Sequence, residues 1–156
     1  MSDQNLSEAQ RWLQQAKHDF EVAQWSAKGG YWSHVCFMAQ QAGEKALKAF
    51  LYAKGERNVV GHALLVLVRR CVRHEASFEE LEPLCRRLDK FYVITRYPDG
   101  LPGLVPSEYF DEDEANQSLE AANLILQTVG NALTQDNASN ASSPTEAEDD
   151  RKDGEG

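Results

Sequence analysis

Apolar residues recur at three- and four-residue spacing along most of the chain, which predicts an all-α protein. The first stripe predicts a helix with Ser7 as N-cap and Gln10 completing a capping box, and Gly29-Gly30 ends it. A second stripe predicts a helix over residues 31–54, ended by Gly55. The inward residues of these two helices are Leu13, Ala16, Phe20, Ala23 and Ala27, then Trp32, Val35, Cys36, Ala39, Ala46 and Phe50.

Three further segments complete the predicted bundle. The apolar run 63–68 is compatible with a buried strand or a helix, and we favour a helix over residues 62–73 because no partner strand is evident. Residues 78–96 form one long helix in this scheme, and a last helix follows Asp111 as its cap. A long non-helical connection, 98–110, separates them, and loops of that length are often functional. The chain is therefore predicted to be an antiparallel helical bundle of about five helices, without internal repeats.

Small residues cluster in the second predicted helix. Ala39, Ala42, Gly43 and Ala46 lie on one side of it, where they would let another helix approach closely. Glycine within a helix costs up to about 1 kcal/mol relative to alanine, so we expect a neighbour packed against Gly43. That neighbour is either the first helix or a second subunit.

Composition divides the 156 residues into two parts. Residues 135–156 contain no large apolar side chain and cannot offset the entropy of ordering, so we predict a folded domain over 1–134 and a disordered acidic tail over 135–156. The tail carries seven acidic and two basic residues, which accounts for five of the nine net negative charges. The mildly acidic body argues against broad nonspecific binding to nucleic acid but allows a small cationic pocket.

The cysteines and the absence of targeting segments predict a cytoplasmic protein. Cys36, Cys71 and Cys85 lie in apolar periodic segments without CxxC spacing, which indicates buried free thiols in a reducing compartment. The first residues are polar, and no apolar run approaches the roughly 20 residues that span a bilayer. The four histidines lack metal-ligand spacing, so we expect no metal and no cofactor.

Two Arg-x4-His segments are the candidate catalytic motifs. Helical ribonucleases can use such a pair, with histidine as general base and arginine stabilising the phosphorane. Arg57 and His62 flank a predicted loop, but His62 can equally be a residue that packs and hydrogen-bonds at the start of its helix. Arg69 and His74 lie near a helix C-terminus, where basic residues complement the helix dipole.

Cations beside the small-residue cluster are candidate phosphate ligands. Lys45 lies next to the cluster, and Lys48 stands in the favourable i, i+4 order after Glu44. The alternative for both lysines is a solvated helix face with one intrahelical ion pair.

The segment Thr95-Arg96-Tyr97-Pro98-Asp99 offers a second cationic candidate. Arg96 can bind a phosphate bidentately, with Tyr97 stacking near a base and Asp99 as an internal counter-charge. Alternatively, Arg96 caps carbonyl groups at the end of its helix.

The runs 40–49, 61–64 and 95–99, with the opening segment 8–20, together resemble the HEPN domain (higher eukaryotes and prokaryotes nucleotide-binding) over about residues 6–134. Members include a nucleotide-binding domain of the chaperone sacsin, partners of small nucleotidyltransferases, and toxin ribonucleases. Family ribonucleases carry an Arg-x4–6-His motif in a late helix, and this chain has no histidine after His74. Members also carry His-Asp-Leu where this chain has His62-Ala63-Leu64.

The resemblance implies a helical bundle that commonly forms homodimers. The principal prediction is a noncatalytic module that binds a nucleotide or a nucleotidyltransferase partner through Lys45, Lys48, Arg96, Tyr97 and Asp99. One alternative is a toxin-type RNA endonuclease of a toxin–antitoxin pair, using Arg57 and His62. Another is a purely structural helical adaptor. No membrane association is expected.

Overall fold

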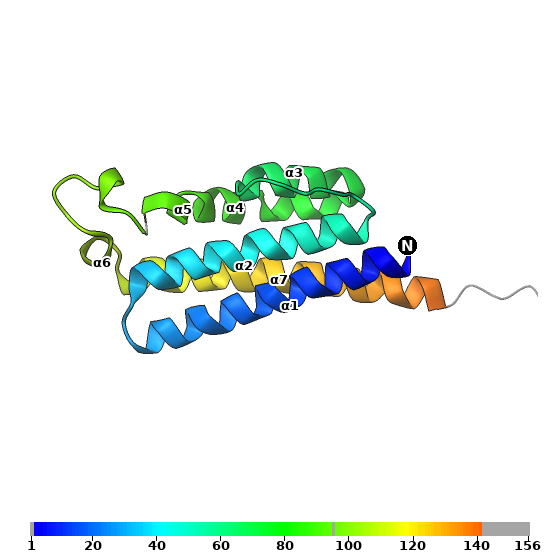
Figure 1. Cartoon of the computed structure of the whole chain (residues 1–156), viewed down its shortest axis with the longest axis horizontal. Coiled ribbons are helices and arrows are strands. Elements are labelled where there is room, and N and C mark those ends of the chain that lie inside the picture. The colour runs from blue at the N-terminus through cyan, green and yellow to red at the C-terminus, as the bar shows by residue number, and fades with distance from the viewer. Residues whose placement is uncertain (1, 95, 142–156) are drawn as a thin grey trace, which may run out of the picture.

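The computed structural model describes residues 2–94 and 96–141, and these form a helical bundle. Helices α1, α2 and α7 run along the length of the molecule, while α3 and α4 lie on the other side of α2 (Figure 1). No strand occurs within these residues, and the predicted all-α class is confirmed. The elements are α1 (Asp3–Lys28), α2 (Trp32–Ala53), α3 (Leu64–His74), η1 (Ala76–Leu81), α4 (Glu82–Asp89), α5 (Phe91–Ile94), η2 (Pro98–Gly100), α6 (Pro106–Tyr109) and α7 (Glu112–Ala141).

The first helix begins earlier than its capping pattern predicted. Ser2 is the N-cap, and its hydroxyl accepts a hydrogen bond from the Asn5 amide at 3.2 Å. The predicted cap at Ser7 is therefore wrong, because the polar turn before it is already helical. The predicted end is confirmed: α1 stops at Lys28, and Gly30 adopts φ +74°, which glycine tolerates without steric cost.

The helix predicted over 78–96 is divided into η1, α4 and α5. Pro83 lies in the first turn of α4, where its missing N–H leaves no hydrogen bond unmade, so a new helix begins there. The connection 98–110 contains the short helices η2 and α6. Asp111 caps α7 as predicted, since its carboxylate accepts from the Glu114 amide at 2.9 Å.

The last helix continues past the predicted domain boundary at residue 134. Helix α7 runs to Ala141, and Asp136 within this extension forms an ion pair with Lys54, which follows α2, at 2.9 Å. Extending an existing helix needs no new nucleation, which explains why a polar segment can remain helical. The rest of the predicted tail, residues 142–156, lies outside the described residues.

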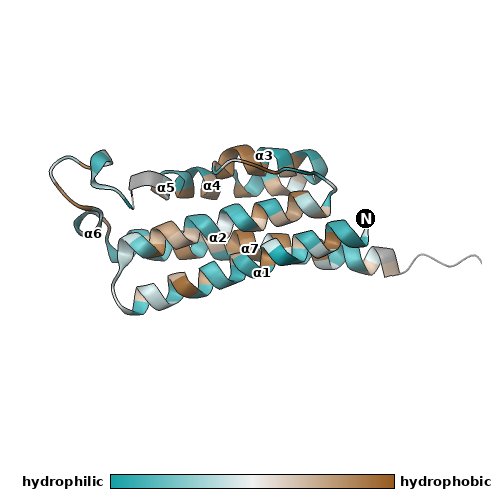
Figure 2. Ribbon diagram, in the orientation of Figure 1, coloured by the Kyte–Doolittle hydropathy of each residue, from teal (hydrophilic) through white to brown (hydrophobic). Residues whose placement is uncertain are grey.

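The core lies between α2 and the helices around it. Hydrophobic and hydrophilic residues alternate along each long helix (Figure 2). The buried side chains form a large cluster that includes Phe50, Phe78 and Ile125, and a smaller one that includes Cys36 and Phe110. All three cysteines are buried free thiols, as predicted. Burial raises the pKa of Cys36 to about 11 and that of Cys85 to about 12, so both thiols are protonated at neutral pH.

Gly43 packs against neither of the neighbours predicted for it. A Cβ atom at this position would lie 2.9 Å from Leu64 of α3, 3.3 Å from Ile125 of α7 and 3.4 Å from Leu88 of α4. The prediction of helix α1 or a second subunit was therefore wrong. Gly43 instead allows α3, α4 and α7 to converge on α2 within one chain.

Replacement of Gly43 by leucine is expected to destabilise the fold by about 1–3 kcal/mol, because overpacking forces neighbouring side chains off their rotamers. Urea unfolding followed by circular dichroism measures this loss. Gly130→Leu in α7 is the matched control, since a Cβ atom added there would meet no atom within 4 Å and leucine favours a helix. Equal urea concentrations at the unfolding midpoint for the two variants would contradict the packing that the structure shows.

None of the helices in the described ranges combines the length and apolar character that crossing a bilayer requires.

Candidate functional site

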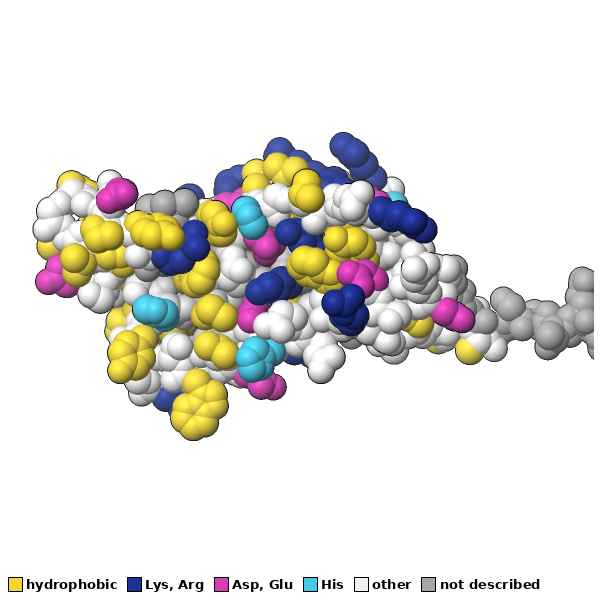
Figure 3. Space-filling view, in the orientation of Figure 1, with side chains coloured by type: hydrophobic (Ala, Val, Ile, Leu, Met, Phe, Trp, Pro, Cys, Tyr) yellow, Lys and Arg dark blue, Asp and Glu magenta, His cyan; other side chains and the backbone are white. Residues whose placement is uncertain are grey.

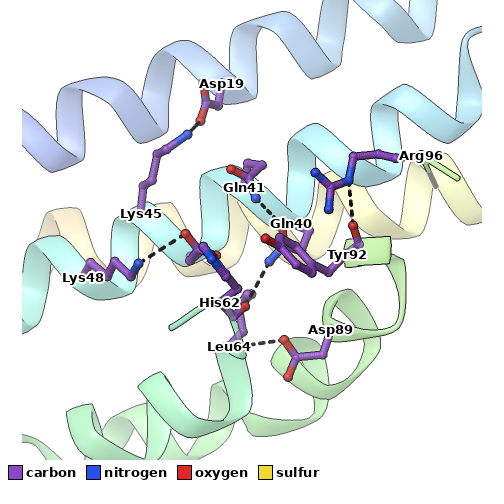
Figure 4. A network of polar contacts seen from close by, with 11 residues as sticks. Asp19, Gln40, Gln41, Lys45, Lys48, His62, Leu64, Asp89, Tyr92 and Arg96 are labelled. Carbon is purple, nitrogen blue, oxygen red and sulfur yellow. Dashed lines mark hydrogen bonds and ion pairs between the residues drawn. The ribbon is translucent and has the colours of Figure 1, made fainter. Parts of the chain in front are cut away.

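A buried carboxylate on α2 organises the polar face of the molecule. The Glu44 side chain is 5% exposed, and its two oxygens contact different partners. Oε2 lies 3.4 Å from Nζ of Lys48, one turn further along α2, and Oε1 lies 2.9 Å from Nδ1 of His62 (Figure 4). The predicted i, i+4 ion pair is confirmed, but it is buried rather than solvated, because the Lys48 side chain is only 6% exposed.

His62 is held by several partners and keeps one edge open. An ionised carboxylate can only accept, so Nδ1 donates to Glu44. Among the described residues no hydrogen bond to Nε2 is found, and this nitrogen can face another molecule. The imidazole stacks on the Tyr92 ring with centroids 4.8 Å apart, and the amide of Gln40 donates to the His62 carbonyl at 3.2 Å. With 58% of its side chain exposed, His62 presents its outer edge to solvent.

The turn that carries His62 is fixed by a distant residue. Ala63 offers no side-chain cap to α3, and the Asp89 carboxylate of α4 accepts instead from the amides of Leu64 at 2.6 Å and Leu65 at 3.0 Å. Asp89 therefore supplies the helix cap, while Glu44 supplies the carboxylate partner of His62. The absence of aspartate from the His62-Ala63-Leu64 sequence does not leave the histidine unpaired.

The second candidate lysine also has a buried partner. Nζ of Lys45 pairs with the Asp19 carboxylate of α1, and Gln15 donates to the other oxygen of Asp19 at 3.0 Å. Asp19 is 5% exposed and Lys45 is 22% exposed, so this pair joins α1 to α2 beneath the surface. Both lysines predicted to hold phosphate are thus already paired with carboxylates.

Arg96 lies at the other end of the same face. Its Nε donates to the Tyr92 carbonyl at 2.9 Å, as the capping alternative predicted. The guanidinium also lies 4.6 Å from the ring centroids of Phe37 and Tyr92 and 5.2 Å from that of Tyr97. Tyr92 therefore stands between Arg96 and His62, and it connects the two groups through its ring and its carbonyl.

The remaining predicted residues do not join this cluster. Arg57 lines a groove with the N-terminal residues of α1 and makes no described contact with His62. Asp99 is exposed in η2, and no ion pair between it and Arg96 is found among the described residues. Arg69 lies 3.5 Å from Glu82, on a different part of the molecule.

His74, the partner predicted for Arg69, lies 2.9 Å from Glu56. Arg70 binds the same carboxylate at 2.6 Å. Burial raises the pKa of Glu56, but the hydrogen bonds and positive charges of Arg70 and His74 outweigh burial and place that pKa below its usual value.

The contacts described above form a band of polar and aromatic side chains from Lys48 through His62 and Tyr92 to Arg96. Lys and Arg, histidine and hydrophobic side chains lie next to one another across the middle of the face in Figure 3. A histidine oriented by a carboxylate can transfer a proton, and an arginine one ring away can stabilise an anion. Among the residues that the structure covers, no group of three or more His, Cys, Asp or Glu side chains could hold a metal ion.

Sequence patterns missed three features of this face. Asp19 lies three residues after Ala16 and four before Ala23, on the buried side of α1. A carboxylate at this position of the apolar stripe could have indicated a buried ion pair. Tyr92 was not among the predicted site residues. The pairing of Glu44 with His62 joins residues 18 positions apart and follows no local rule.

Comparison with known proteins finds a matching domain family and similar solved structures. Residues 9–132 match the model of the HEPN domain. A protein named "Putative toxin MJ1304" from Methanocaldococcus jannaschii is 28% identical over 83% of this chain and 90% of its own length. The crystal structure of TT1696 from Thermus thermophilus has a TM-score of 0.76 at 36% identity, covering 80% of this chain and 97% of its own. The crystal structure of ST0689, an archaeal HEPN homologue, has a TM-score of 0.67 at 32% identity and covers 81% of this chain and 98% of its own.

Proposed function

Because the chain belongs to the HEPN domain family, we propose that it is a toxin-type protein that binds RNA across the α2 face and cleaves it with His62 as the proton-transfer group. The observation that carries the proposal is the pair formed by His62 and the buried Glu44. The similarity to a protein named as a toxin also supports the proposal of a toxin-type protein.

The chemistry follows from the free edge of His62. Nε2 takes the proton of a ribose 2′ hydroxyl, whose oxygen forms a bond to the adjacent phosphorus. The bond from phosphorus to the 5′ oxygen breaks, and that oxygen receives a proton from solvent. Glu44 holds the imidazole in the orientation that exposes Nε2 and stabilises the imidazolium that forms. The guanidinium of Arg96 is the cation placed to stabilise the charge that develops on the phosphate.

Arg96 replaces Arg57 in this proposal. The toxin alternative drawn from the sequence paired His62 with Arg57, which lines another groove. Arg96 is connected to His62 through Tyr92 and is the better candidate. Lys48 acts on the site indirectly, because its charge is paired with Glu44.

The nature of the RNA ends tests this proposal. Purified protein incubated with single-stranded RNA is expected to give 2′,3′-cyclic phosphate and 5′-hydroxyl ends, which mass spectrometry identifies. These ends follow from attack by the 2′ oxygen, so an oligomer with 2′-O-methyl groups should remain uncut. Products with 5′-phosphate ends, or intact RNA at micromolar protein, would refute the proposed reaction.

One observation favours a second candidate, a noncatalytic module that binds nucleotides. In the part of the chain that the structure describes, no Lys or Arg side chain contacts His62 directly. Binding of RNA or a nucleotide without cleavage in the same experiment would support this candidate. The homodimer and the nucleotidyltransferase partner stay predictions.

A further inference from the structure

A cleft along α1 lies next to the proposed reaction site. It has a volume of about 680 Å³, and its lining includes Trp12, Gln14, Gln15 and Lys45. This volume lies within the range of roughly 300–1,000 Å³ that is typical of small-ligand sites. The cleft contains none of the residues that the proposed reaction uses.

Trp12 connects the cleft to the reaction site. Its indole stacks on the Tyr52 ring with centroids 5.5 Å apart, and Nζ of Lys48 lies 5.4 Å from the indole centroid. Lys48 in turn binds Glu44, which holds His62. A continuous chain of contacts therefore runs from the cleft to the imidazole, and both ends belong to the same face of the molecule.

The polar groups of the cleft fit a nucleobase better than a phosphate. Arg11 pairs with Glu8 at 2.8 Å, and Lys45 pairs with Asp19, so these two positive charges at the cleft are balanced. The N–H of Trp12 donates to Glu8 at 3.1 Å, which fixes the ring. Tyr52 and Lys48 contact the ring from α2, and the ring also lines the cleft, where a base can stack against it.

Two amides in the same cleft can recognise a base edge. Gln15 donates through its nitrogen to Asp19 and keeps its oxygen as an acceptor, while the exposed Gln14 offers a donor and an acceptor. Aromatic stacking with amides nearby is how proteins bind the bases of single strands.

We propose that this cleft is a nucleobase-binding subsite for single-stranded RNA, in which a base stacks on Trp12 while a neighbouring phosphodiester lies at His62. The inference rests on the proposed RNA cleavage and adds a site for a base and the residue that contacts that base. Duplex RNA does not fit, because its bases are stacked on one another and are not available to Trp12.

Binding without cleavage tests the subsite. Fluorescence anisotropy at fixed salt compares two labelled probes, a 2′-O-methyl oligoribonucleotide and a phosphodiester oligomer of equal length and charge that lacks bases. Trp12→Ala is expected to weaken binding of the first probe roughly tenfold and to leave binding of the second within about twofold, because one stacked base is lost. Trp12→Phe, which keeps a ring, should restore most of the affinity.

Trp25→Ala is the matched control, since Trp25 is an exposed tryptophan on the same helix and outside the cleft. It should bind both probes as the wild type does. Equal loss for both probes in Trp12→Ala, or no loss for either, would overturn the subsite. If Trp12→Ala weakens binding of the base-containing probe alone, and the wild-type protein cuts no RNA, the subsite is supported and the proposed reaction is refuted. Cleavage by a protein whose Trp12→Ala variant binds normally would overturn the subsite alone.

Discussion

Glu44→Ala is expected to lower the free energy of unfolding by about 3–5 kcal/mol, the usual cost of removing one partner of a buried ion pair. The loss is large because Lys48, with 6% of its side chain exposed, would keep a charge without a carboxylate partner or free access to water. His62 would also lose its carboxylate partner. Urea unfolding at constant pH measures the change, and the variant is expected to fold only marginally, since domains are stable by roughly 5–15 kcal/mol.

A double variant distinguishes the cost of an unpaired buried charge from the cost of lost packing. Glu44→Leu combined with Lys48→Met removes both charges and fills the volume, and such replacements are often neutral or stabilising. The double variant should therefore be more stable than Glu44→Ala. Glu82→Ala is the surface control, because its partner Arg69 is 57% exposed and such pairs contribute about 0–1 kcal/mol. If Glu44→Ala and Glu82→Ala cost the same, Glu44 does not anchor a buried ion pair.

The sequence predicted the helices well because each carries its own periodic pattern. The inward positions from Val35 to Phe50 are buried, and the glycines that end α1 and α2 do so as expected. It did less well over residues 78–96, which were predicted to form one helix. Pro83 lies in the first turn of α4, so a new helix begins within this range.

The candidate site was harder to predict because its partners are distant in the chain. The cations Lys45, Lys48 and Arg96 were recognised, but local spacing offers no means of telling a paired lysine from a free one. Asp19 lies 26 residues from Lys45, and Asp89 lies 25 residues from the amide of Leu64 that it caps. Such contacts depend on how the helices cross, and the spacing of residues along the chain does not predict this geometry.

His62→Ala is expected to reduce the rate of RNA cleavage by about 10²–10⁴, the range usual for loss of a general acid or base. Its side chain is 58% exposed, so the fold should tolerate the change and the loss should appear in the chemical step. Single-turnover cleavage of a labelled single-stranded RNA measures this rate directly. Expression of the wild-type protein should slow growth, and expression of the variant should not.

His74→Ala controls for the loss of an imidazole elsewhere in the chain, because His74 lies at the end of α3 and pairs with Glu56, not with Glu44. It should cut RNA at the wild-type rate. Glu44→Gln adds a test of positioning: glutamine can still accept the Nδ1–H bond, so its rate should fall less than that of His62→Ala, with little change in RNA affinity. If His62→Ala and His74→Ala cut RNA equally fast, proton transfer by His62 is excluded and the α2 face serves binding alone.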